Sequence, residues 1–194
     1  MVKLSGRNKI PTSVFISGTG TNLKNLIKFS LLRNSPISIN FVVSNNINAK
    51  GLIFAKKYKI NTKVFDYKNK FRAESLILKY LKKNKIKLIC LAGFMKILSK
   101  TFIKKFKGKI INIHPSLLPK YKGLNTHYRV IKNKEKFSGC TVHFVNSSLD
   151  AGKIILQKKV KISKKDNPIS LAKKILKQEH ILYPKAIFKI SSNL

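Results

Sequence analysis

Short apolar runs alternate with amphipathic stretches along most of the chain. The runs are bounded by glycine, proline or polar residues, a pattern typical of strands buried on both faces. Between them, apolar side chains recur three and four positions apart, which predicts amphipathic helices. The predicted strands are 13–17, 37–44, 63–66, 87–93 and 110–114, and the predicted helices are 23–31, 49–59, 71–83 and 126–132.

The alternation of strands and helices predicts one α/β domain. We expect a Rossmann-like, mostly parallel twisted sheet with right-handed crossovers and helices on both faces. Toward the C-terminus, the apolar runs 140–145 and 154–162 leave no room for a helix between them, so we expect an antiparallel pair at the sheet edge. Helical patterns then continue to residue 190. We interpret 1–12 as a flexible N-terminal extension and 13–194 as the domain.

Composition narrows the class of protein. The chain has 194 residues, 43% of them hydrophobic, which is enough for a full core. No apolar run approaches the ~20 residues of a membrane span, and the first residues lack the apolar stretch of a signal peptide. We therefore expect a cytoplasmic protein without membrane contact. Cys90 and Cys140 each lie in strand-like apolar sequence, so buried reduced thiols are expected rather than a disulfide or a metal site.

The charge is strongly positive. There are 42 Lys and Arg residues against 6 Asp and Glu, a formal net charge of +36. Such a balance raises the alternative of a non-enzymatic, basic nucleic-acid-binding module. However, only four of the basic residues are arginine, and the lysines are spread along the whole chain. We interpret the charge as compositional bias that suits small anionic substrates, with no specific nucleic-acid partner.

The central chemical feature is Asn112-Ile113-His114-Pro115. Asn112 and His114 lie two positions apart at the end of a strand, so their side chains point to the same face. Pro115 cannot continue a ladder, which places the imidazole at the sheet rim where open parallel sheets bind ligands. A lone histidine there is usually structural. Beside a carboxamide, it is a candidate for stabilising an oxyanion and moving a proton.

A glycine turn follows the first predicted strand. In Gly18-Thr19-Gly20-Thr21-Asn22 the glycines let the backbone approach an anion, and the start of the following helix favours negative charge. The third glycine and the later acidic residue of a dinucleotide fingerprint are missing. The stretch therefore predicts a phosphate-binding turn, with an ordinary turn as the alternative.

Asp150 is one of six acidic residues and lies in the loop between the last two predicted strands. One interpretation is a turn-forming residue. If the fold brings it to His114, we expect its carboxylate to raise the pKa of the imidazole and to fix the tautomer.

Six motifs, in order along the chain, resemble the phosphoribosylglycinamide formyltransferase family, also called GAR transformylases. Together they extend from residue 14 to about residue 190. The motifs are Ser17–Leu23, Leu91–Leu98, Asn112–Lys120, Val142–Val145, Leu149–Gly152 and Gln178–His180.

The resemblance implies transfer of a formyl group from 10-formyltetrahydrofolate, as co-substrate, to the amine of glycinamide ribonucleotide in purine biosynthesis. It implies no metal and a monomer or weak homodimer. It also implies site residues at matching positions. These are the catalytic Asn112, His114 and Asp150; Gly20, Thr21, Asn22 and Glu179 for the ribonucleotide; and Arg72, Met95, Lys96, Ile97, Leu98, Asn112, Asn146, Ser147, Ser148, Leu149 and Asp150 for the folate.

Two related enzymes remain as alternatives. Methionyl-tRNA formyltransferase shares the Asn-x-His-Pro core but normally adds a C-terminal RNA-binding domain, which we do not expect after residue 190. Formyltetrahydrofolate deformylase usually carries an N-terminal regulatory domain, also not expected here. The chain departs from the family at Asn125, where a histidine is common, and in the loop 146–148, where acidic residues are common.

Overall fold

The structure is a computed structural model that describes residues 9–193. Its strands form one seven-stranded sheet in the order β3-β2-β1-β4-β5-β6-β7. The first five strands run parallel, whereas β6 is antiparallel to both β5 and β7. The strands are β1 Ile10–Ile16, β2 Ile37–Ser44, β3 Asn61–Val64, β4 Leu88–Leu91, β5 Lys109–His114, β6 Phe137–Phe144 and β7 Ile154–Lys161.

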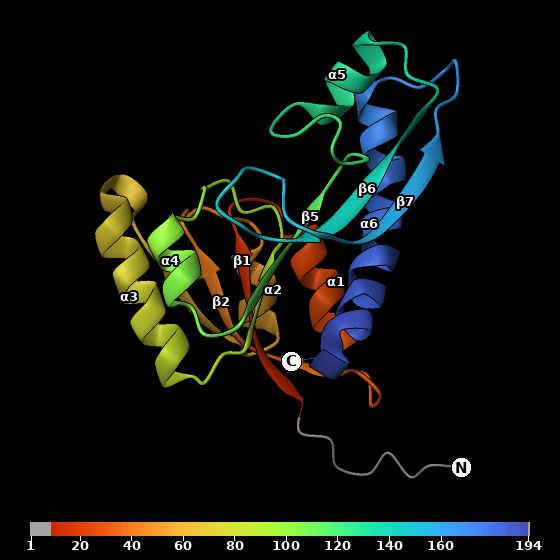
Figure 1. Ribbon diagram of the computed structural model, residues 1–194. Helices are drawn as coiled ribbons and strands as arrows, with labels where there is room; N and C mark the ends of the chain where they lie inside the picture. Colours follow the sequence, from red (N-terminus) through yellow and green to blue (C-terminus); the bar gives the residue numbers. More distant parts are fainter. Residues whose placement is uncertain (1–8, 194) are drawn as a thin grey trace.

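Helices cover both faces of the sheet. Figure 1 shows α3 and α4 together on one side and α1 and α6 on the other. In the described part of the chain, no helix is long and apolar enough to cross a membrane. The helices are α1 Thr21–Ser30, α2 Leu52–Lys57, α3 Lys70–Lys83, α4 Lys100–Lys105, α5 Thr126–Lys132 and α6 Pro168–Ile190, with 3-10 turns η1 Tyr67–Asn69 and η2 Ser191–Asn193.

The predicted Rossmann-like fold with an antiparallel C-terminal edge is confirmed. One boundary is wrong: β1 begins at Ile10 and pairs with Ile37, so residues 10–12 belong to the sheet and not to an extension. Residues 1–8 lie outside the described part. The helix α4 was not predicted because only Phe102 of its six residues is buried, which gives a weak periodic signal.

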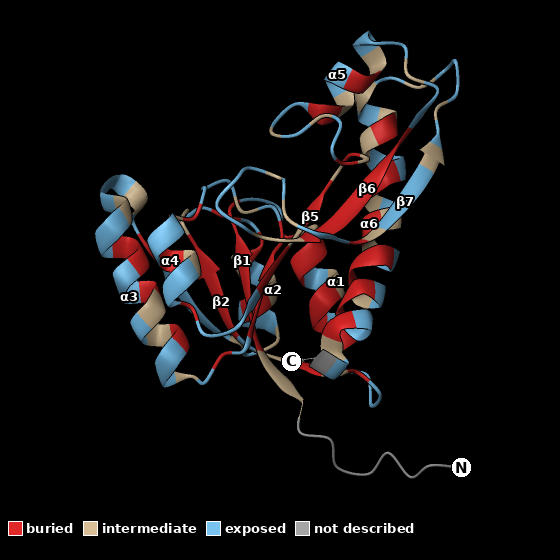
Figure 2. Ribbon diagram, in the orientation of Figure 1, coloured by how far each residue is buried: buried red, intermediate tan, exposed pale blue. Residues whose placement is uncertain are grey.

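The buried apolar residues lie on both faces of the sheet, under the helices. Most residues of the central strands β1, β4 and β5 are buried, and the longer helices α1, α3 and α6 each bury one side (Figure 2). One apolar cluster lies between the sheet and α1, α2 and α6, and a second lies under α3 and α4. Such burial stabilises the fold by about 25 cal/mol per Å² of apolar surface, so these clusters fix the strands that carry the polar residues.

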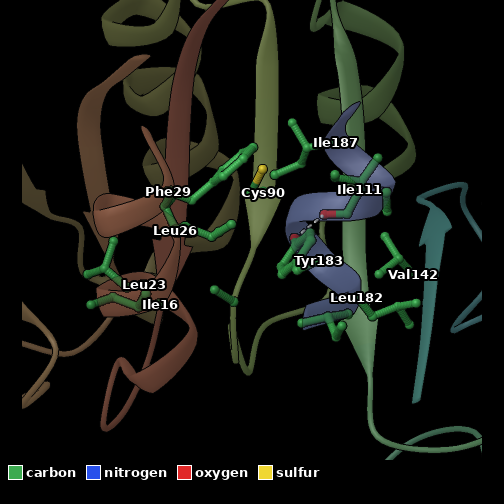
Figure 3. Packing of buried hydrophobic residues seen from close by; sticks show 14 of the residues in the cluster. Ile16, Leu23, Leu26, Phe29, Cys90, Ile111, Val142, Leu182, Tyr183 and Ile187 are labelled. Carbon is green, nitrogen blue, oxygen red and sulfur yellow. Dashed lines mark hydrogen bonds between the residues drawn. The ribbon is translucent and has the colours of Figure 1, made fainter. Parts of the chain in front are cut away.

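Tyr183 ties α6 to the two strands that lead to the polar rim. Its fully buried hydroxyl lies 3.3 Å from the carbonyl oxygen of Ile111 (Figure 3). The same hydroxyl lies 2.9 Å from the carbonyl oxygen of Leu91. One hydroxyl hydrogen is thereby shared between the end of β4 and the middle of β5. The contact with Tyr183 therefore fixes β5 at the residue that precedes Asn112.

Candidate active site

The strand order reverses between β1 and β4, which is where ligands bind in open parallel sheets. The two loops that flank this point are bonded to each other. The Ser17 N–H donates to the Gly93 carbonyl at 3.1 Å, and the Met95 N–H donates to Ser17 Oγ at 2.7 Å. The glycine turn and the loop after β4 thus form one rim, next to the end of β5.

The structure brings together Asn112, His114 and Asp150, the three residues that the resemblance implied as catalytic. His114 Nδ1 lies 3.3 Å from Asp150 Oδ2, and Asn112 Nδ2 lies 3.4 Å from Asp150 Oδ1. The first two come from β5, and the third comes from the loop between β6 and β7. Within residues 9–193, no group of three or more His, Cys, Asp or Glu side chains is arranged to hold a metal ion.

A fourth side chain, His143, was missed as a site residue. The antiparallel register places it opposite Asn112, with its Nε2 3.2 Å from Asn112 Nδ2 and 3.7 Å from Asp150 Oδ1. Its Nδ1 is 2.8 Å from the Phe144 carbonyl, which can only accept, so Nδ1 carries a hydrogen and Nε2 faces Asn112 and Asp150. The imidazole therefore fixes the orientation of the carboxamide. Its place inside the motif Val142–Val145 was the available signal.

His114 is held at both ring nitrogens. Its Nε2 lies 2.8 Å from the Tyr121 carbonyl, so Nε2 carries a hydrogen and Nδ1 is the nitrogen that faces Asp150. Burial lowers the pKa of His114 below its usual value, although the Tyr121 carbonyl and the Asp150 carboxylate act in the opposite direction. The expectation that Asp150 raises this pKa is confirmed, but burial is the larger effect, so the net pKa lies below the usual value.

Asp150 has both a turn-forming and an electrostatic role. Its backbone is left-handed, with φ 46°, a conformation that aspartate tolerates better than most residues. Its Oδ2 accepts the Gly123 N–H at 2.9 Å, and its side chain is only 8% exposed. Burial alone would raise the pKa of this carboxyl, but His143, the Gly123 N–H and His114 outweigh it and hold the pKa below its usual value. The carboxylate is therefore ionised.

The glycine turn and the distant Glu179 also meet. Gly20 caps α1 with φ 71°, and α1 has no side-chain N-cap, so its first N–H groups are left for another acceptor. Asn22 Nδ2 donates to Glu179 Oε2 at 2.7 Å. Glu179 is buried, which raises its pKa. Residues predicted to bind one ligand from opposite ends of the chain are therefore neighbours.

Gly20 also has no room for a side chain. A Cβ there would lie 2.4 Å from the Gly51 Cα, in a left-handed conformation that costs L-residues energy. We expect Gly20→Ala to lower the free energy of unfolding by about 2–5 kcal/mol in urea titrations. Gly18→Ala is the matched control, because its Cβ meets nothing within 4 Å. Equal effects of both variants would contradict this assignment.

The residues predicted for the folate are only partly assembled. Met95 and Ile97 are 63% and 60% exposed beside the rim, whereas Leu98 is buried in the core under α4. The segment 146–149 is exposed and leads into Asp150. Arg72 lies in the first turn of α3, exposed, and its guanidinium has no hydrogen-bond partner among the described residues. Among residues 9–193, no hydrogen bond or ion pair joins it to another predicted site residue.

Known proteins resemble the chain over most of its length. The family model described as formyl transferase matches residues 12–187. Phosphoribosylglycinamide formyltransferase of Haemophilus influenzae is 43% identical over 178 residues, 90% of this chain and 84% of that protein. The chain is also 43% identical to trifunctional purine biosynthetic protein adenosine-3 of Gallus gallus, but spans only 19% of it. The crystal structure of phosphoribosylglycinamide formyltransferase from Brucella melitensis is 40% identical with TM-score 0.90, covering 96% of this chain and 98% of that one.

Proposed function

The chain belongs to the formyl transferase family, and on this premise we propose that it transfers the formyl group of 10-formyltetrahydrofolate to the amine of glycinamide ribonucleotide. The observation that carries the proposal is the meeting of Asn112, His114 and Asp150 at the sheet rim. A carboxamide, an imidazole and an ionised carboxylate at one point suit the attack of an amine on a formyl carbon.

The ribonucleotide lies, in this proposal, across the glycine turn. Its phosphate is bound by the backbone of Gly20 and Thr21 and by the uncapped N–H groups at the start of α1. Its ribose hydroxyls bind Glu179, whose other neighbour is Asn22. The buried carboxyl favours this assignment because it has few polar partners in the protein. The amine then points toward His114.

The folate lies against the loop after β4 and the loop before Asp150. Met95, Lys96 and Ile97 offer exposed apolar and backbone groups, and Leu98 contributes through its backbone because its side chain is buried. Asn146, Ser147, Ser148 and Leu149 cover the ring from the other side. Arg72 binds the glutamate tail of the folate where that tail extends to α3.

The reaction requires two proton movements. The amine attacks the formyl carbon, a C–N bond forms, and the carbonyl electrons move to oxygen. Asn112 Nδ2 faces this oxygen, since its 3.4 Å bond to Asp150 is the weaker of its two contacts. The proton of the attacking nitrogen passes to the His114–Asp150 pair at Nδ1, and the imidazolium, stabilised by the carboxylate, returns it to N10 of the folate as that C–N bond breaks. The Asp150 carboxylate and the Tyr121 carbonyl stabilise this imidazolium, whereas burial opposes it.

A negative charge at the glycine turn provides a specific test. In Thr21→Asp, a carboxylate repels the phosphate, and we expect the KM for the ribonucleotide to rise about tenfold, equivalent to about 1.4 kcal/mol. Thr21 is the first residue of α1, where aspartate favours the helix, so the fold is retained. Thr21→Asn is the neutral control, with a KM close to that of the unaltered chain. An unchanged KM in Thr21→Asp would make the segment an ordinary turn.

The proposed activity is tested by following tetrahydrofolate release with three acceptors. We expect release from 10-formyltetrahydrofolate only when glycinamide ribonucleotide is present. Release without any added acceptor would instead indicate a deformylase, and release with methionyl-tRNA alone would indicate the tRNA enzyme. Either of these outcomes would overturn the proposal.

A further inference from the structure

The contact that orients His114 is a backbone carbonyl on an irregular segment. The carbonyl belongs to Tyr121, whose own backbone is left-handed with φ 57°. A tyrosine in this conformation is unusual and is kept only when its surroundings hold it there. The position of the carbonyl, and with it the tautomer of His114, therefore depends on what holds Tyr121.

The side chain of Tyr121 is held at its far end. Its hydroxyl donates to Glu135 Oε1 at 2.9 Å and accepts from Asn133 Nδ2 at 3.0 Å. The hydrogen bond from Tyr121 is the main cause that keeps the pKa of Glu135 below its usual value, so the acceptor is a carboxylate. Hydrogen bonds to an ionised acceptor are about twice as strong as neutral ones.

The segment that contains Tyr121 and Lys122 also contacts α5. The guanidinium of Arg129 lies 5.3 Å from the Tyr121 ring centre and donates to the Lys122 carbonyl at 2.6 Å. In Figure 1 this loop and α5 lie together at the top of the view, beyond the end of β5. The contacts of Glu135, Asn133 and Arg129 thus converge on the one residue whose carbonyl touches His114.

We propose that Glu135 and the Tyr121 hydroxyl are positioning residues that hold the Tyr121 carbonyl against His114 Nε2, so that Nδ1 remains the working nitrogen. The proposal rests on the transfer function proposed above. Neither residue touches a substrate. The carbonyl orients the imidazole from behind, as a buried carboxylate does in hydrolase triads, and it stabilises the imidazolium formed during transfer.

The contact with the Tyr121 carbonyl also affects the pKa of His114. Besides the carbonyl, the charged or titratable groups that face His114 are Asp150, His143 on β6, and Arg129 and His127 on α5. None of these four is altered by a change at Tyr121 Oη or Glu135. The bond from Nε2–H favours the charged ring, so loosening it lowers the pKa of His114 further.

The direct test is an NMR titration of the imidazole nitrogens in ¹⁵N-labelled, unliganded protein. We expect the unaltered chain to have neutral His114 with hydrogen on Nε2 alone. In Tyr121→Phe and in Glu135→Ala, both tautomers should be populated and the pKa should fall by about 0.5. The double variant should lose no more than either single one, because both act on one contact. In kinetics, kcat should fall about tenfold with KM little changed.

Two control variants distinguish a positioning role from a general effect on stability. Glu135→Gln keeps an oxygen acceptor for the tyrosine hydroxyl and should restore the Nε2–H tautomer. Lys120→Ala removes the other partner of Glu135, since Lys120 Nζ lies 3.2 Å from Glu135 Oε1 and its side chain is 69% exposed. The Tyr121 side chain is unaltered, so the tautomer and the pKa of His114 should not change. If Tyr121→Phe and Glu135→Ala leave the tautomer and pKa unchanged, even with a loss of stability, the proposal is overturned. The titration requires no turnover, so its result can be interpreted even if the proposed transfer activity is not found.

Discussion

Replacing His114 with alanine is expected to lower kcat about 10³-fold, the range attributed to a positioned general acid and base. The side chain is 7% exposed and contacts the Tyr121 carbonyl and Asp150. Its loss removes the group that accepts and returns the proton. Both KM values should change little, because neither the glycine turn nor the loop after β4 is altered. Steady-state kinetics with each substrate varied in turn measures this.

His114→Gln is the matched variant. Glutamine fills a similar volume and donates a hydrogen bond to the Tyr121 carbonyl, but it does not titrate. We expect it to be as inactive as His114→Ala. If glutamine restores most of the turnover, hydrogen bonding alone is sufficient and the proposed proton transfer through Nδ1 is wrong.

Asp150→Asn should lower kcat about 10²-fold, because it removes the charge that opposes burial at His114. Without the carboxylate, the pKa of His114 falls further below its usual value, so the imidazolium becomes harder to form. Asparagine adopts the left-handed backbone of this position and still accepts the Gly123 N–H, so the loop is retained. The pH dependence of kcat and an NMR titration of His114 measure the two effects.

Asp166→Asn is the control for loss of a buried aspartate charge. Asp166 contacts Lys174 and Ser170, and these contacts hold its pKa at about 2, but it lies outside the site. Its replacement should lower stability and leave kcat unchanged. If Asp150→Asn retains normal turnover, Asp150 has only a turn-forming role.

Several site features were predictable because local rules determine them. Pro115 ends β5, and the two-residue period of a strand puts Asn112 and His114 on one face. The glycine turn is likewise local in its backbone, since Gly20 adopts φ 71°, which glycine tolerates best, whereas its contact with the distant Gly51 is seen only in the fold. These features depend on a few neighbouring residues, so one sequence was sufficient to predict them.

Other features depend on geometry that a single sequence does not contain. The role of His143 follows from the register of β5 and β6, which long loops separate. The contact of His114 with Tyr121 involves a backbone carbonyl, which every residue has, so it leaves no sequence signal. The pKa of His114 depends on the balance between burial and Asp150, and only the folded structure shows that burial is the larger.

The most direct test of the central claim follows the formyl carbon itself. The chain is incubated with glycinamide ribonucleotide and 10-formyltetrahydrofolate labelled with ¹³C in the formyl group, and products are observed by NMR. We predict that the label moves to the amide of the formylated ribonucleotide, and that His114→Ala stops this transfer. Label that appears as free formate, or that remains on the folate with the ribonucleotide present, would contradict the account.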